Sequence, residues 1–185
     1  VDPGHPFPYI SNLSLNLAVG VREPNDTEVR FARIKVPSVL PRFFGLDDGR
    51  RYVALEQIIA AHLQAMFPGM IIESHHLFRV IRNADLALEE EEAEDLLAAI
   101  EVELRRRRFG SVVALHVDVD MPDELVSLLM HELELEDIDG YRISGPLGLS
   151  RLFEIAELDR PGLKDEPGPP RTQDRWQGRE AKPTH

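Results

Sequence analysis

The sequence predicts an α+β domain in which a mixed, largely antiparallel sheet has about four helices packed against it. Strand-like alternation near the N-terminus, separated by turn residues, indicates an antiparallel hairpin. Further along, apolar residues at helical spacing alternate with strand-like runs, which gives the expected order β-β-α-β-α-β-α-(β)-α. A chain of 185 residues with 43% hydrophobic and 29% charged residues has the length and composition of one globular domain.

The first two strands are expected over residues 11–23 and 29–36. Five apolar residues at every second position predict a first strand with one buried face: Leu13, Leu15, Leu17, Val19 and Val21. Pro24-Asn25-Asp26 is typical of a turn, so the two strands should form a hairpin. Residues 37–49, rich in Pro, Gly and Asp, are predicted to be a loop.

The central part of the chain predicts a helix, a long strand and a second helix. Leu55, Ile58, Ile59, Leu63 and Met66 recur at helical spacing, and Pro68-Gly69 ends that helix. Residues 70–82 are expected to form the strand. The acidic run 89–95 opens a helix that ends at the basic run 105–108, an arrangement that suits the helix dipole.

The C-terminal part predicts a strand over 113–119, a helix after Pro122, a short strand over 140–144 and a helix over 147–158. After Asp159 the apolar pattern ends and prolines become frequent. We therefore expect a domain over residues 5–167, followed by a disordered or unrelated tail over 168–185.

Composition excludes several function classes. The chain has no cysteine, which removes disulfides and thiol chemistry and fits a cytoplasmic location. Its net charge of −12 argues against nucleic-acid binding, because such a surface repels phosphate polymers unless it carries a local basic patch. No signal peptide or transmembrane segment is expected, and the opening without Met suggests a piece of a longer protein.

Most enzyme motifs are missing or incomplete. Gly140 and Gly145 have the spacing of P-loop glycines, but Pro146-Leu147 stands where the Lys and Ser/Thr would be. His131-Glu132 begins a zinc-protease motif that fails at Leu135, where the second His is needed. The residues therefore predict no catalytic, cofactor-binding or metal-binding side chain.

His116, Asp118 and Asp120 are the strongest metal candidate, since residues at i, i+2 and i+4 of a strand share one face. The structural alternative, a solvated strand face opposite an apolar one, is favoured. His75 and His76 are adjacent in a strand and should point to opposite faces, one exposed and the other near the core.

The candidate interaction residues are Arg79, Arg82, Asn83 and Asp85, at the end of the long strand. Two arginines beside a turn can present forked donors to a phosphate or a carboxylate. They can equally tie the turn to a neighbouring domain. The basic run 105–108 leaves a similar choice between phosphate binding and a solvated helix end.

A set of collinear blocks resembles the middle, or head, domain of the long bacterial polyphosphate kinases. The blocks are HPFPYISNLSLNLAV at 5–19, FARIKVP at 31–37, MFPGM at 66–70, FRVIRNADL at 78–86, RRRFG at 106–110, GPL at 145–147 and DRPGLK at 159–164. Two departures stand out. Gly148 replaces an Asp that is common in the family, and Leu115-His116-Val117 replaces a more usual Leu-Glu-Val.

The resemblance implies an enzyme that uses ATP and Mg²⁺ to transfer the terminal phosphate reversibly to polyphosphate through a phosphohistidine. In that family the phosphohistidine and the phosphate-binding arginines lie in other domains, so none of the seven histidines here inherits that role and no cofactor is expected in this chain. The head domain supports dimer assembly and domain arrangement, so its expected partners are other domains of the same enzyme and a second copy. The alternative is a stand-alone module that binds polyphosphate, another anion or a protein.

Overall fold

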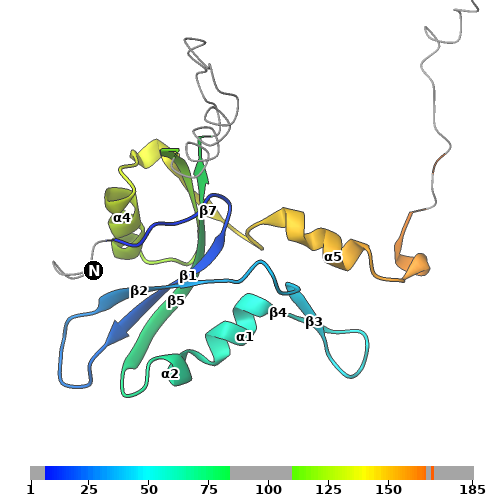
Figure 1. Cartoon of the computed structure of the whole chain (residues 1–185), viewed down its shortest axis with the longest axis horizontal. Coiled ribbons are helices and arrows are strands. Elements are labelled where there is room, and N and C mark those ends of the chain that lie inside the picture. Colours follow the sequence, from blue (N-terminus) through cyan, green and yellow to red (C-terminus); the bar gives the residue numbers. More distant parts are fainter. Residues whose placement is uncertain (1–6, 84–109, 166–167, 169–185) are drawn as a thin grey trace, which may run out of the picture.

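A five-stranded sheet organises the computed structural model, which describes residues 7–83, 110–165 and 168 (Figure 1). The strand order is β2-β1-β5-β6-β7, and all neighbours are antiparallel except β6 and β7. The strands are β1 (Leu15–Arg22), β2 (Arg30–Lys35), β5 (Ile71–Arg82), β6 (Val112–Asp118) and β7 (Gly140–Ile143). The α+β class and the largely antiparallel sheet are confirmed.

The helices of the described part are short. They are α1 (Leu55–Ala61), α2 (Leu63–Met66), α4 (Asp123–Glu132) and α5 (Phe153–Ala156), with 3-10 turns η1 (Asp137–Asp139), η2 (Leu149–Leu152) and η3 (Pro161–Leu163). The helix expected over 55–66 is broken at His62, whose backbone leaves the helical region at φ −110° and ψ 9°. The expected helix over 89–104, the basic run 105–108 and the tail beyond Gly168 lie outside the described residues.

The first strand was expected to have one buried face, and that expectation is wrong. Residues 16–21 are buried on both faces, because β1 lies between β2 and β5 and both sides of the sheet are covered. On one side Ala18 joins a cluster with Phe78, Leu115 and residues of α4. On the other side Leu17, Val19 and Val21 pack with Leu63 of α2.

The loop expected over 37–49 contains part of a second, two-stranded sheet. Strands β3 (Phe43–Gly45) and β4 (Tyr52–Ala54) pair antiparallel, with Phe43 opposite Ala54. The Asp48 carboxylate closes the turn between them by accepting the backbone N–H groups of Arg50 and Arg51, each at 3.0 Å. Strands of three residues are too short to show alternation, which is why the pattern missed them.

We call residues 37–54 together with 147–165 the hairpin lobe. Figure 1 shows α5 on the same side of the molecule as β3 and β4, away from α4. Arg151 reaches backbone carbonyls of the loop before β3, and the Arg160 guanidinium donates to the Gly49 carbonyl at the hairpin turn. Two segments about a hundred residues apart in sequence therefore form one unit beside the sheet. In the ranges 7–83 and 110–165, no helix is long and apolar enough to cross a bilayer.

Candidate functional site

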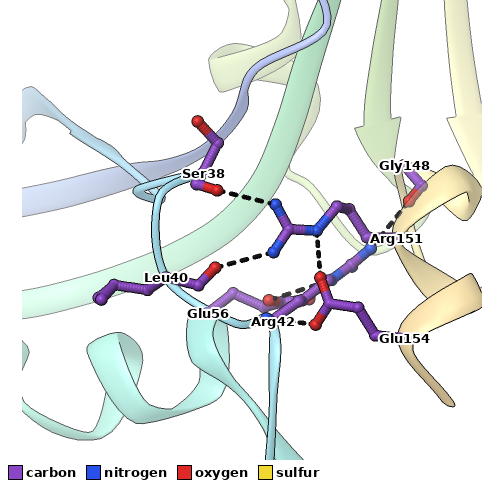
Figure 2. Close-up of polar contacts among 7 residues, drawn as sticks. All are labelled: Ser38, Leu40, Arg42, Glu56, Gly148, Arg151 and Glu154. Atoms are coloured by element: carbon purple, nitrogen blue, oxygen red, sulfur yellow. Dashed lines mark hydrogen bonds and ion pairs between the residues drawn. The ribbon is translucent and has the colours of Figure 1, made fainter.

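A buried ion pair joins the hairpin lobe to α1 (Figure 2). Arg42 and Glu56 are only 4% and 6% exposed. The Arg42 guanidinium donates from Nε to both Glu56 oxygens at 3.0 and 3.3 Å, and from Nη2 to Oε1 at 2.6 Å. Its Nη1 donates to the Gly148 carbonyl at 2.9 Å. One guanidinium thus fastens the start of β3, the N-terminus of α1 and the loop before η2.

A second, half-exposed pair extends this network along α5. Arg151 donates to the carbonyls of Ser38 at 3.0 Å and Leu40 at 2.8 Å, and its Nε pairs with Glu154. Glu154 also accepts the backbone N–H of Arg42 at 2.7 Å (Figure 2). Burial pushes the Glu154 pKa upward, but these hydrogen bonds outweigh it and leave the pKa below its ordinary value.

A cavity of about 280 Å³ lies beside this network, between the sheet and η2. Four cationic side chains line it: Lys35, Arg42, Arg79 and Arg151. The other polar residues of its wall are Ser11, Asn12, Ser14, Ser38 and Ser150. The cavity therefore combines positive charge with hydroxyl and amide groups.

Arg79 is the least satisfied of these cations. Its Nε is buried without a hydrogen-bond partner, and no hydrogen bond or ion pair of its guanidinium is found among the described residues. Burial and, second, the charge of Arg42 lower the Arg79 pKa. Gly148 forms the adjoining wall in the left-handed conformation, at φ +68°. A Cβ there would lie 3.6 Å from Nη1 of Arg79 and 3.7 Å from Nη1 of Arg42.

The other candidate interaction residues lie elsewhere. The Arg82 guanidinium donates to the carbonyls of Ile10 and Gly110, each at 2.8 Å, and covers the Tyr9 ring at 4.5 Å. The backbone N–H of Asn83 donates to Ser111 at 2.9 Å. Asp85 lies outside the described residues. Arg79 thus lines the cavity, whereas Arg82 joins the N-terminal segment to the residues that lead into β6.

The metal candidate on β6 does not share one strand face. The strand ends at Asp118, so Asp120 lies in the following turn and the expected i, i+2, i+4 geometry is lost. His116 meets the Tyr141 ring edge-on at 5.6 Å, and burial and then Arg79 lower its pKa. Over residues 7–83 and 110–165, no three metal-ligating side chains come together. His75 is exposed and His76 half-buried, as alternation predicts.

Sequence reasoning missed most of this site. Arg42 and Glu56 are 14 residues apart, and Arg42 and Gly148 are 106 apart. Neither separation corresponds to a local motif, so no spacing signal could have paired them. Arg79 was the exception, because two arginines at the end of a strand already marked that region.

The protein is thus an α+β domain with a cationic cavity between its sheet and the hairpin lobe, which ion pairs and hydrogen bonds hold together. A model of the polyphosphate kinase middle domain matches residues 1–155, and the chain therefore belongs to the polyphosphate kinase family, in its middle domain. The resemblance carried by the collinear blocks is confirmed.

Individual relatives agree. The chain is 55% identical over 179 residues to a polyphosphate kinase of Synechocystis. The aligned part covers 90% of this chain and 25% of that relative. It is 52% identical over 164 residues to a polyphosphate kinase of Streptomyces coelicolor, over 89% of this chain and 22% of that relative. The crystal structure of a polyphosphate kinase from Porphyromonas gingivalis is similar at a TM-score of 0.64 and 23% identity, over 97% of this chain and 26% of that one. That last likeness concerns the fold. The chain spans about a quarter of the length of these proteins.

Proposed function

We propose that this chain is the assembly domain of an enzyme that reversibly transfers the terminal phosphate of ATP to polyphosphate. The phosphohistidine, the ATP site and the Mg²⁺ site belong to parts of that enzyme beyond these 185 residues. The role of this domain, over residues 5–167, is to support dimer formation and to position the neighbouring domains. The support comes from the family, from the quarter-length coverage of relatives and from one surface.

That surface is the hairpin lobe, which exposes many large apolar side chains. They are Val39, Leu40, Phe44, Leu46, Leu149, Phe153, Ile155 and Leu163. Phe153 is 69% exposed and Val39 is 90% exposed. Single exposed apolar residues are ordinary, but a concentration of them on one small lobe is typical of a surface that another protein part covers. This concentration is the observation that carries the proposal.

The polar network makes such a surface useful for assembly. Because Arg42 and Arg151 hold the loop before β3 against η2 and α5, the apolar side chains are presented on a fixed backbone. A preorganised surface loses less conformational entropy on association than a loose one does. The lobe can therefore set the position of a neighbouring domain or subunit.

An assay of the isolated chain tests the enzymatic part of the proposal. The purified 185-residue chain, incubated with ATP, Mg²⁺ and a polyphosphate primer, should make no polyphosphate. Turnover that co-purifies with the chain, and persists after contaminating kinases are removed, would contradict the proposal.

A chimera tests the assembly role. The matching segment of the Synechocystis enzyme is replaced by this chain, and sedimentation and polyphosphate synthesis are measured together. The parent chimera should assemble and turn over, whereas Phe153→Asp on the lobe should reduce both. Val29→Asp, at a 54% exposed site next to β2, is the matched control and should change neither. Equal behaviour of the two variants would count against the lobe as an assembly surface.

A further inference from the structure

We propose that the cavity beside Arg79 binds a small phosphate-type oxyanion. The inference rests on the cavity of this chain and holds whether or not the enzyme assembles through the hairpin lobe. It assigns the cavity a ligand class: a free phosphate ion or the end of a phosphate chain.

The charge around the cavity is unbalanced. Four cations line it, and two of them are paired: Arg42 with Glu56 and Arg151 with Glu154. Lys35 and Arg79 have no carboxylate partner among the described residues, so the cavity carries an excess of two positive charges. The whole chain has a net charge of −12, so the positive charge at the cavity is a local exception to an acidic composition.

The Arg79 guanidinium can donate hydrogen bonds to an anion in the cavity. A guanidinium has five donors and no acceptor, so its hydrogen bonds must go to oxygen atoms of another group. Arg42, which lines the same cavity, already donates to Glu56 and Gly148 and has the same sign of charge. A guanidinium whose donors have no acceptor is costly in a cavity wall, and an anion in the cavity would supply acceptor oxygens to this one.

The rest of the wall favours a tetrahedral oxyanion over a carboxylate. Lys35 Nζ lies 2.9 Å from the Ser11 hydroxyl, so a charged donor and a hydroxyl stand together at one end. Ser38 and Ser150 add hydroxyls on the side of the hairpin lobe. Donors on several sides match the several acceptor oxygens of a phosphate, whereas a carboxylate has two oxygens in one plane. A volume of about 280 Å³ suits a ligand of one to a few phosphoryl groups.

Gly148 offers a sharp test, because it stands where a side chain would enter the cavity. Its left-handed backbone is one that Asp and Asn tolerate better than other residues do. In Gly148→Asp the new carboxylate would reach both arginines, since the Cβ is already 3.6 and 3.7 Å from their Nη1 atoms. It would occupy the place of the ligand. Gly148→Asn has the same shape without the charge and is the matched control.

The experiment measures the thermal midpoint and the binding isotherm of the whole 185-residue chain at constant ionic strength. The probes are sodium orthophosphate, sodium tripolyphosphate and, as the carboxylate control, sodium acetate. Orthophosphate or tripolyphosphate should raise the midpoint of the unmodified chain, since a ligand of the native state stabilises it. Gly148→Asp should weaken that binding by at least about tenfold, and Gly148→Asn by no more than about threefold.

The outcomes divide clearly. Equal binding of both phosphates assigns the cavity to the free ion, and much tighter tripolyphosphate binding assigns it to a chain end; each supports the proposal. It is overturned if neither phosphate binds, if acetate binds as well as phosphate, or if Gly148→Asp binds as tightly as Gly148→Asn. Should Gly148→Asp fail to fold, Arg79→Gln takes its place, and unchanged phosphate binding in that variant also overturns the proposal.

Discussion

The sheet and the hairpin lobe are held together by different forces. The sheet is stabilised by apolar burial on both faces, with Phe78, Val80 and Leu115 inaccessible to solvent. In the hairpin lobe, all of whose residues are described, the buried side chains are those of Arg42 and Leu147. Ion pairs and hydrogen bonds to backbone carbonyls hold the lobe together, whereas apolar contacts hold the sheet together.

The difference indicates what each region is for. A region that buries its apolar side chains internally is stable by itself, whereas one that exposes them and bonds internally through charge is suited to being covered by a partner. In the proposed function the sheet is the scaffold, and the lobe is the assembly surface that it presents. Four substitutions or changes of condition test this contrast.

The largest effect is expected in the sheet core. Phe78→Ala should lower the free energy of unfolding by about 3–5 kcal/mol, because it leaves a cavity at a 0% exposed site. The matched control is Phe44→Ala in the lobe, at a 37% exposed site, which should cost less than about 1 kcal/mol. Urea denaturation measures both. Similar losses for the two phenylalanines would remove the distinction between the regions.

The next effect concerns the ion pair that anchors the lobe. Glu56→Gln should destabilise the lobe by about 3 kcal/mol, since it leaves the Arg42 charge buried without compensation. Amide hydrogen exchange should accelerate in the lobe more than in β1 and β5. Glu23→Gln, which removes an exposed partner of Arg30, is the control and should change stability by less than about 0.5 kcal/mol. Uniform acceleration over the whole chain would mean that the lobe is not a separate unit.

Acid should weaken the two regions at different pH values. Burial, the largest factor, and His75 lower the His76 pKa below 6.5, against the opposing effect of Asp118 and Asp120. The unfolded chain then binds this proton more readily, so sheet stability falls as the pH drops below about 6.5. The Glu154 pKa is below its ordinary 4.5, so the contribution of this carboxylate to the lobe is lost only below about pH 4.5.

His76→Gln should reduce the loss of stability between pH 7 and 5.5, as followed by urea denaturation at several pH values. Part of the loss should remain, because burial lowers the pKa of His116 in the same sheet as well. His131→Gln, which replaces an 85% exposed histidine of α4, serves as the reference for any effect of the substitution itself. If His76→Gln and the unmodified chain lose stability in parallel over this range, His76 is not the group responsible.

The smallest effect on stability is expected at the exposed apolar surface. Leu149→Ser in η2, at a 63% exposed site, should change the free energy of unfolding of the isolated chain by less than about 0.5 kcal/mol. Leu147→Ser, two residues earlier and 2% exposed, should cost at least about 2 kcal/mol. A large loss in Leu149→Ser would show that the lobe uses this side chain internally and does not hold it for a partner.

Alternation and helical spacing predicted most of the fold. The strands at β2, β5 and β6 and the helix α4 fall where the apolar pattern places them. The first strand begins later than expected, at Leu15, and Leu13, expected on its buried face, is 55% exposed in the turn before it. The pattern did not show that β1 is buried on both faces, because Asn16, Ala18 and Gly20 are not strongly apolar and only their neighbours in space bury them. It also missed β3 and β4, which are too short to alternate.

The candidate site divides in the same way. Arg79 and Arg82 were identified from their place at the end of a strand, yet only the tertiary structure puts one in a cavity and the other against backbone carbonyls. The departure at Gly148 was visible in the sequence as a missing carboxylate. Its position against the Nη1 atoms of Arg79 and Arg42 was not.

The sequence by itself determined the fold class, the order of the main elements and the polyphosphate kinase family, because these depend on local periodicity and on collinear blocks. The tertiary structure decided which charged side chains form ion pairs and which charged side chains line the cavity without one among the described residues. Folding pairs Arg42 with Glu56, 14 positions away, and brings its guanidinium to the Gly148 carbonyl, 106 positions away, while Arg79 lines the cavity. Pairing of charges depends on distance and burial in space, and neither is encoded in any local spacing.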